Sequence, residues 1–363
     1  MIQELKEVLL DDFWIMPATP NYKHEGVPYI TSKNIKNGKI DFNNVHYIDR
    51  EDYKKISRNR PICVGDILIS MIGTLGETAI VTESDGEFYG QNMFLVRLNE
   101  NKINHRYFMN FFKSESVKFQ LLNKQNKSTQ SYLKANHIES LKIPIPSLDI
   151  QKERACKLDK IQEIIDIRKK QIESLDVLIK ARFVELFGDY RINEKGFDCK
   201  KGSELFKFSS GKFLPEEKRL DEGTPVYGGN GIAWYTNEYL IDYPTIIIGR
   251  VGAQCGNIHA VTTPVWITDN AIYIKEQKTK AYTLEFLTEL MRMMDFSQYA
   301  DFSGQPKITQ KPLETLDYIM PPIELQNEYT AFVKQTDKSK LELQKSLEEM
   351  QNLFDSLMAE YFG

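Results

Sequence analysis

Residues 149–187 read DIQKERACKLDKIQEIIDIRKKQIESLDVLIKARFVELF, and this charged stretch carries apolar residues at a regular interval. Four of them follow one another every seven residues: Leu158, Ile165, Ile172 and Ile179. Apolar residues that recur every seven positions form the seam along which the helices of a coiled coil pack. The stretch therefore predicts a long helix over 149–188, which at 1.5 Å per residue would reach about 60 Å. Taken alone, the segment is also compatible with an ordinary core helix.

The end of the chain repeats this stretch. Gln151, Glu185 and Phe187 recur 175 positions later, as Gln326, Glu360 and Phe362. The second copy has its own seam at alternating spacings of four and three, formed by Leu343, Leu347, Met350, Phe354 and Leu357. Two matching copies favour the coiled coil, because each seam offers the other a partner. The repeat predicts a tandem duplication that places a second long helix over 323–363.

Each long helix follows a strand-rich globular part. Strands are indicated by residues 66–72 and 245–248, which precede turns rich in glycine. Pro144 and Pro146, like Pro321 and Pro322, end the globular part before each helix begins. We expect an α+β fold with an approximate internal two-fold, organised as 1–148, 149–188, 189–322 and 323–363.

The charge of the chain is unevenly distributed. The formal net charge is -4, and residues 324–363 alone hold eight acidic residues against four lysines. Because the chain as a whole is acidic, any surface that binds nucleic acid would have to be a local basic patch. Residues 102–142 could form such a patch, since they carry eight basic residues against two acidic ones. The alternative interpretation is that these basic residues lie on the solvated face of a helix. The aromatic residues within 107–119 more readily form a helix core than a surface on which bases stack.

The sequence lacks the motifs of several enzyme classes. No phosphate-binding loop occurs, and the Pro321–Pro322 pair lacks the Asn or Asp before it and the aromatic residue after it that an amino-methyltransferase uses. The charged residues 215–218 weakly resemble a nuclease cluster, although exposed turn charges are the better interpretation. Histidines and the four cysteines show no metal-binding spacing. We expect a non-enzymatic binding protein without metal or cofactor.

The same sequence contains no stretch of about 20 apolar residues, and its start lacks the order of charged and apolar residues typical of a signal peptide. We therefore expect a cytoplasmic protein without membrane contact.

A specific set of motifs recurs in order across the chain. The first copy has Gly65–Ser70, then Gly73, Gly76 and Gln91–Asn92, and the second has residues 245–256 and Asp269–Asn270. The junctions 143–151 and 320–326 complete each copy. In this order, the full chain resembles the specificity subunit of type I restriction-modification systems.

This resemblance implies two target-recognition domains, separated by two long antiparallel helices that form a coiled coil. Each domain would read one half of a bipartite double-stranded DNA target, and the target would be asymmetric because the two domains differ. The helix length would limit the separation of the half-sites to about 17 base pairs. The partners implied are two methyltransferase subunits, which hold S-adenosylmethionine, and two restriction subunits in the full nuclease.

Side chains that contact base edges are expected on loops, where Arg and Lys suit guanine and Asn and Gln suit adenine. In the first domain the candidates are Ser32, Lys33, Asn34, Lys127, Ser128 and Gln130. In the second they are Lys212, Tyr227, Asn230, Arg250, Gln254, Gln305 and Lys307. A turn or capping role is the alternative for each. Asn92 and Asn270, which are duplicated, are interpreted as structural amides.

Two other classes of function remain open from the residues. The chain could be a self-contained nuclease or methyltransferase, which an activity assay on the purified protein would detect. It could also be a coiled-coil scaffold for proteins, which would lack the steep salt dependence of DNA binding.

Overall fold

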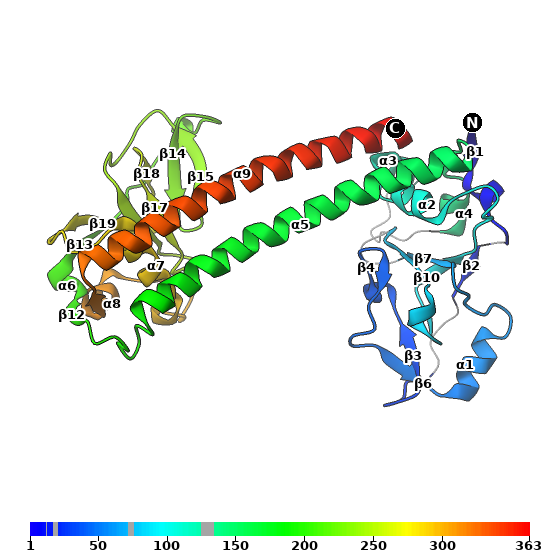
Figure 1. The fold of residues 1–363 in the computed structure, drawn as a ribbon, viewed down its shortest axis with the longest axis horizontal. Coiled ribbons are helices and arrows are strands. Elements are labelled where there is room, and N and C mark those ends of the chain that lie inside the picture. Colours follow the sequence, from blue (N-terminus) through cyan, green and yellow to red (C-terminus); the bar gives the residue numbers. More distant parts are fainter. Residues whose placement is uncertain (12, 17–20, 72–75, 125–133) are drawn as a thin grey trace. The chain divides into compact units, whose positions relative to one another are not determined.

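The structure is a computed structural model that describes residues 1–363 except 12, 17–20, 72–75 and 125–133. Its contacts divide the chain into unit 1, Met1–Lys169 with Ser346–Gly363, and unit 2, Lys170–Lys345. Two helices of 40 residues each, α5 (Leu148–Phe187) and α9 (Ile323–Phe362), are shared between the units (Figure 1). The predicted helices 149–188 and 323–363 thus start within one residue of the observed ones. The division into compact units cuts across both.

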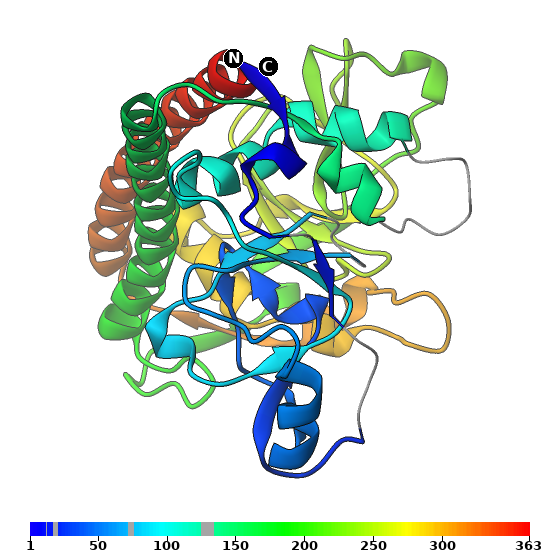
Figure 2. The ribbon, with the colours of Figure 1, turned by 90° about the vertical axis from the view of Figure 1, so that its right-hand side faces the viewer.

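Unit 1 combines short strands with helices (Figure 2). Its strands are β1 (Ile2–Glu4), β2 (Trp14–Ile15), β3 (Val27–Ile30), β4 (Ile35–Lys36), β5 (Lys39–Ile40), β6 (His46–Ile48), β7 (Ile67–Ser70), β8 (Thr78–Ile80), β9 (Tyr89–Gly90), β10 (Met93–Val96) and β11 (Lys142–Pro144). Its helices besides the long ones are α1 (Arg50–Ser57), α2 (His105–Phe112), α3 (Glu115–Lys124) and α4 (Ala135–Glu139), with 3-10 turns η1 (Leu5–Val8), η2 (Ser32–Asn34) and η3 (Glu83–Asp85).

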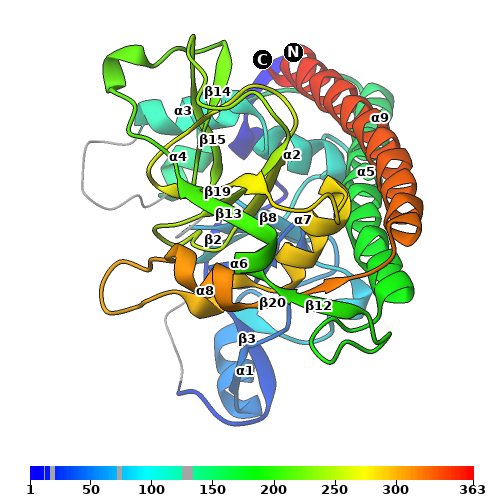
Figure 3. The ribbon, with the colours of Figure 1, turned by 90° about the vertical axis from the view of Figure 1, so that its left-hand side faces the viewer.

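Unit 2 has the same character (Figure 3). Its strands are β12 (Asp198–Lys201), β13 (Phe206–Ser210), β14 (Thr224–Gly228), β15 (Gly231–Thr236), β16 (Thr245–Gly249), β17 (Ile258–Val261), β18 (Trp266–Ile267), β19 (Ala271–Gln277) and β20 (Asp317–Met320). Its shorter helices are α6 (Gly202–Leu205), α7 (Leu284–Met293) and α8 (Gln310–Thr315), with 3-10 turns η4 (Glu216–Lys218) and η5 (Phe296–Tyr299).

The sheets of the two units have the same topology. A four-stranded sheet has the order β2-β10-β7-β8 in unit 1 and β13-β19-β16-β17 in unit 2. A three-stranded sheet has the order β6-β3-β9 in unit 1 and β15-β14-β18 in unit 2, and in each the last pair is parallel. The tandem repeat in sequence is thus a repeat of α+β structure, as predicted. Between β3 and β6, unit 1 contains an additional hairpin, β4–β5.

The core of each unit contains one end of each long helix. In unit 1, Leu158 near the start of α5 shares a hydrophobic core with Met358 and Phe362 at the end of α9. The ring of Phe362 lies 4.9 Å from that of Tyr107 on α2, between ring centroids. The start of one long helix therefore packs with the end of the other, which is the pairing of antiparallel helices.

Unit 2 repeats this arrangement with the helices exchanged. Phe187 at the end of α5 lies 4.6 Å from Phe286 on α7 and 5.6 Å from Tyr329 near the start of α9, between ring centroids. Phe187 and Phe362 are a repeat pair, so each copy of the helix ends in a phenylalanine that enters a core. Both are buried because the aromatic rings remove a large apolar area from water.

Candidate nucleic-acid interface

Four loops of unit 2 converge on one surface groove of about 490 Å³. They are the turn between β14 and β15, the connection that follows β16, the segment that precedes α8, and the turn between β18 and β19. The groove, called here the unit 2 groove, is lined by Gly228, Gly229, Asn230, Ala233, Trp234, Val251, Ala253, Gln254, Thr268, Asn270 and Gln305.

Glycine at the end of β16 lets two of these loops approach each other. A Cβ atom on Gly249 would lie 2.5 Å from the carbonyl oxygens of both Gly229 and Gln254. No side chain fits in that space, so the backbone itself brings the Asn230 turn close to the Gln254 loop.

Backbone hydrogen bonds attach the third loop to the second. The N–H of Gly252 donates to the carbonyl of Pro306 over 2.9 Å, and the backbones of Val251 and Lys307 form an antiparallel bridge. The N–H of Asp301 also donates to the carbonyl of Lys307 over 2.9 Å, which closes the loop on itself. Gln305 therefore stands on a loop whose two sides are both held.

The side chains of the groove are mostly uncharged hydrogen-bonding groups. Four amides line it: Asn230, Gln254, Asn270 and Gln305. The Oγ1 atom of Thr268 and the Nε1 atom of Trp234 are buried and have no hydrogen-bond partner among the described residues. Buried polar atoms without a partner are uncommon in folded proteins. A ligand with donors and acceptors along one edge would suit this groove.

The structure brings together three of the seven candidates predicted in unit 2. Asn230, Gln254 and Gln305 line the groove, and Gln254 Oε1 accepts a hydrogen bond from Asn257 Nδ2 over 2.7 Å. Arg250 instead donates from Nη1 to the carbonyl of Asp269, over 3.3 Å.

The other three unit 2 candidates lie outside the lining of the groove. Lys212 and Lys307 are exposed, and Tyr227 is half-buried, which raises the pKa of its phenol.

Three residues of the groove were missed or interpreted differently at the level of sequence. Trp234 and Thr268 carry no loop signal, because Trp234 is on a strand and Thr268 directly follows one. The sequence predicts a structural amide for Asn270, as for Asn92. The backbone of Asn92 has φ of 61°, which is the left-handed region that Asn tolerates in turns, whereas Asn270 lines the groove.

In unit 1, the prediction that Asn34 contacts a base has to be corrected. Its Oδ1 atom accepts from the N–H of Thr31 over 2.9 Å, and its Nδ2 atom donates to the carbonyl of Asp41 over 2.8 Å. The residue is buried. Its amide caps the η2 turn and is not free to reach a base. Ser32 is half-buried and Lys33 is exposed in the same turn. Lys127, Ser128 and Gln130 lie outside the described residues.

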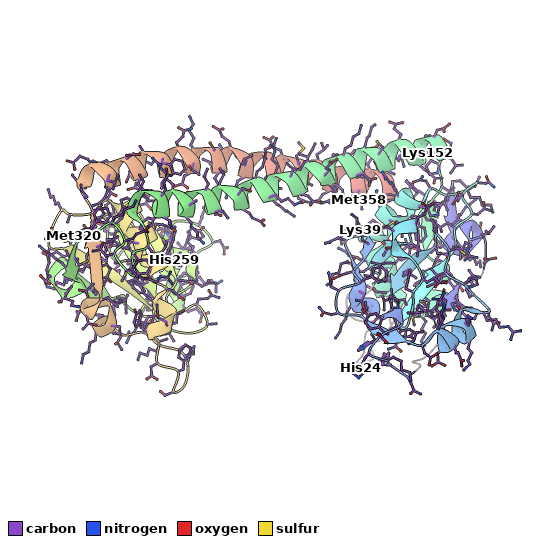
Figure 4. All side chains as sticks on the ribbon, turned by 60° about the horizontal axis from the view of Figure 1, so that its bottom comes forward. His24, Lys39, Lys152, His259, Met320 and Met358 are labelled. Atoms are coloured by element: carbon purple, nitrogen blue, oxygen red, sulfur yellow. The ribbon has the colours of Figure 1, made fainter. Side chains whose placement is uncertain are left out.

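Unit 1 has a larger hollow, the unit 1 cleft, of about 640 Å³. It is lined by residues of the β4–β5 hairpin, of β8 and the segment after it, of α2 and of α5: Asn37, Gly38, Lys39, Ile40, Ile80, Thr82, Ser84, Asp85, Arg106, Met109, Asn110, Lys113 and Asp159. Figure 4 marks Lys39 on this unit.

The carboxylates of the unit 1 cleft are already engaged. Asp85 accepts from the N–H and the hydroxyl of Thr82 over 2.6 and 2.8 Å, and Asp159 pairs with Arg106 over 3.1 Å. In contrast, Lys39 and Lys113 have no ion-pair partner within the described part of the chain, and neither has the buried Nδ2 atom of Asn110 a hydrogen-bond partner there. The remaining donors suit an anion.

All nine predicted helix-pairing residues are at least half-buried. Leu158 and Ile165 are buried, and Ile179, Phe354 and Leu357 pack against the unit cores. Ile172, Leu343, Leu347 and Met350 are half-buried.

Within the described residues, no group of three or more His, Cys, Asp or Glu side chains is placed to hold a metal ion. In the charged segment 215–218, Glu216 and Glu217 are exposed, and Lys218 pairs with Glu238 over 2.5 Å. Among the same described residues, none of the helices contains an apolar stretch of the length that a lipid bilayer requires.

Comparison with known proteins places this arrangement in context. The family model described as "Type I restriction modification DNA specificity domain" matches residues 6–177 and again 194–350. The putative type I restriction enzyme MjaX specificity subunit of Methanocaldococcus jannaschii is 27% identical, over 97% of this chain and 92% of the relative. The EcoprrI specificity subunit of Escherichia coli is also 27% identical, over 53% of this chain and 50% of its own.

Two solved structures have a similar fold. The S subunit of a type I restriction-modification system from M. genitalium superimposes with a TM-score of 0.66 at 18% identity, covering 100% of this chain and 96% of the other. A chain from a study of complex assembly and conformational transition in a type I system gives 0.61 at 17% identity, covering 100% and 97%.

Proposed function

The chain belongs to the type I restriction modification DNA specificity family, and from this premise we propose that it recognises an asymmetric, bipartite duplex sequence with its two units. DNA target specificity is the role of this family. The fold class and the family predicted from the sequence are confirmed by the two matches of the family model.

The observation that supports base recognition is the unit 2 groove. Its four amides, Asn230, Gln254, Asn270 and Gln305, come from separate loops. The side-chain amide of Asn or Gln can donate a hydrogen bond to N7 of adenine and at the same time accept one from the N6 amino group. This makes Asn and Gln suitable for an A·T pair in the major groove. We assign the half-site contacts of unit 2 to this groove.

The units differ where the groove is built, which supports an asymmetric target. Unit 2 joins β14 to β15 by the short turn around Asn230, whereas unit 1 places residues 31–45 with the β4–β5 hairpin between β3 and β6. Two surfaces that are built differently on one topology would select different half-sites.

The unit 1 cleft is assigned to the phosphate backbone. Lys39 and Lys113 are exposed donors that remain available after the carboxylates are paired. Backbone contacts position a protein on duplex DNA and carry no direct sequence information.

The catalytic steps are assigned to partner subunits. Specificity subunits of type I systems assemble with methyltransferase and restriction subunits and are in general non-catalytic. For this chain we propose two methyltransferase subunits, which hold S-adenosylmethionine and flip the target base, and two restriction subunits in the complete nuclease. The complex would act on DNA in the cytoplasm.

Co-expression with the methyltransferase subunit of the same system tests the proposal. Mapping of methylated bases should return one bipartite, asymmetric sequence. The variants N230A and Q305A should weaken discrimination in one half-site only, by about tenfold, while a control, Q277A at the exposed end of β19, leaves the target unchanged.

Other outcomes would favour the alternatives. Methylation or cleavage of DNA by the purified chain alone would indicate a self-contained enzyme. Absence of sequence-specific methylation, together with an affinity for DNA that does not depend on salt concentration, would indicate a protein-interaction scaffold.

A further inference from the structure

His259 on β17, labelled in Figure 4, lies next to the turn that carries Asn230. The backbone of Gly229 is close enough to the imidazole to raise its pKa as a hydrogen-bond acceptor would. On the other side of Asn230, a Cβ atom on Gly231 would lie 3.4 Å from Cε1 of the ring, and φ of Gly231 is +102°, which favours glycine. The ring thus lies beside the backbone on both sides of Asn230.

The repeat shows that this strand position does not require a histidine. In unit 2, His259 pairs across the sheet with Ile247. The corresponding strand pair of unit 1 is Ala79 with Leu68, since β7 and β8 occupy the places of β16 and β17. Ala79 is buried, and the backbone of Gly38 lies against it. A small side chain is thus sufficient where the chain itself packs on the strand.

The surroundings of His259 favour the neutral form of its imidazole. Burial is the main cause that lowers the pKa of His259, and the nearby positive charge of Arg292 on α7 lowers it further. Arg292 is itself paired with the buried Glu289 over 3.5 Å. A neutral imidazole has a single N–H donor, and the backbone of Gly229 is the acceptor beside it. The Nε2 atom has no hydrogen-bond partner among the described residues.

We propose that His259 is a positioning residue for base recognition: its contacts with Gly229 and Gly231 hold the Asn230 turn in the geometry that the unit 2 groove requires. The proposal rests on the proposed function of that groove. His259 does not itself touch DNA. It acts through Asn230, and its effect is confined to the half-site of unit 2.

Three substitutions separate the parts of this role, each tested in the complex with the methyltransferase subunit. H259A removes the ring, H259F keeps its volume without the hydrogen bond, and H259N keeps a donor near the position of Nδ1. Methylation rates are measured on the cognate duplex and on duplexes altered in one half-site. H259A and H259F should lose about tenfold in discrimination at the unit 2 half-site, and H259N should retain most of it.

Discrimination at the unit 1 half-site is the internal control and should not change in any of the three. A double variant gives a second, independent measurement. If His259 acts through Asn230, N230A/H259A discriminates no worse than N230A alone, whereas independent contributions would multiply.

Two results would overturn the inference: unchanged discrimination in both H259A and H259F, or equal losses in both half-sites, which would indicate a general loss of folding. Either result leaves the proposed function intact as long as the unsubstituted complex discriminates in both half-sites. If the unsubstituted complex does not discriminate, the proposed function itself fails.

Discussion

Gln151 and Gln326 make the same three hydrogen bonds in the two units. Gln151 Oε1 accepts from the N–H of Asn104 over 2.9 Å, and its Nε2 donates to the carbonyls of Lys102 and Pro146 over 3.0 and 2.9 Å. Gln326 bonds Thr283, Ala281 and Pro321 in the same way, over 2.9, 2.8 and 2.9 Å. Both side chains are fully buried. Each glutamine thus joins the first turn of a long helix to the N-terminus of α2 or α7.

Loss of this joint should be costly in either unit. Q326L keeps the volume of the side chain but leaves a buried N–H and two carbonyls without partners, which should lower the free energy of unfolding by about 3 kcal/mol. Urea unfolding measures the change. Q344A, at an exposed position of α9, is the matched control and should change stability by less than about 0.5 kcal/mol. An equally stable Q326L would contradict the role described here.

The end of α9 should be a structural part of unit 1. Phe362 is 1% exposed among Tyr107 and Phe111, so F362A should leave a cavity and destabilise unit 1 by about 3 kcal/mol. L353A, on the exposed side of the same helix, should have a small effect. Hydrogen exchange of amides in α2 would locate the loss, and unchanged exchange there would argue against this packing.

The unit 1 cleft should contribute to the salt dependence of DNA binding. K39A and K113A should each reduce the slope of log K against log salt by about 0.9, because each removes one phosphate contact. The ratio of affinities for cognate and unrelated duplexes should stay constant. K118A is the control, since Lys118 is paired with Glu115 over 2.6 Å. A changed ratio would place these lysines on bases instead.

Substitutions of Asn34 and Lys33 should distinguish an effect on protein stability from an effect on DNA recognition. N34A removes the cap of the η2 turn and should lower the free energy of unfolding by about 1 kcal/mol, with unchanged discrimination between DNA sequences in the surviving folded protein. K33A, at the exposed neighbour, should leave stability unchanged. Thermal unfolding together with methylation of half-site variants measures both quantities, and loss of discrimination without loss of stability in N34A would restore its role as a base contact.

Acidification should weaken unit 2 through His259. Its folded-state pKa lies below the ordinary 6.5, so below about pH 6.5 the unfolded chain binds a proton that the folded chain does not. Stability therefore falls as the pH drops from there toward the folded pKa. The charged and titratable groups near the ring are Tyr227 on β14 and Arg292 on α7, and Arg292 is paired with Glu289. Urea midpoints at about pH 7.5 and 5.5 should differ less for H259N than for the unsubstituted chain.

Much of the architecture could be predicted from residues alone, because helices and repeats are local patterns. The seven-residue spacing of Leu158 to Ile179 reports which face of a helix is apolar, and both observed helices start within one residue of prediction. The prolines of the junctions also act locally, since a proline inside a helix removes a hydrogen bond.

The candidate site was only partly predictable. Asn230, Gln254 and Gln305 carry the chemistry that suits bases, but nothing along the chain says that their loops meet. That meeting depends on Gly249, where two backbones approach too closely for any side chain. Asn34 has the same chemistry as Asn230, and only the contacts with Thr31 and Asp41 show that its amide is already used.

The order of residues is enough to show that this chain is a duplication of a strand-rich part followed by a long helix, because periodicity and self-similarity are properties of the chain. Tertiary structure decided how equivalent positions are used. Arg106 pairs with Asp159 in unit 1, and at the same places in unit 2 Glu285 pairs with Lys334, with the charges exchanged. An ion pair is conserved there although neither residue is, since Coulomb attraction depends on two side chains being close in space, and closeness between distant residues exists only after folding.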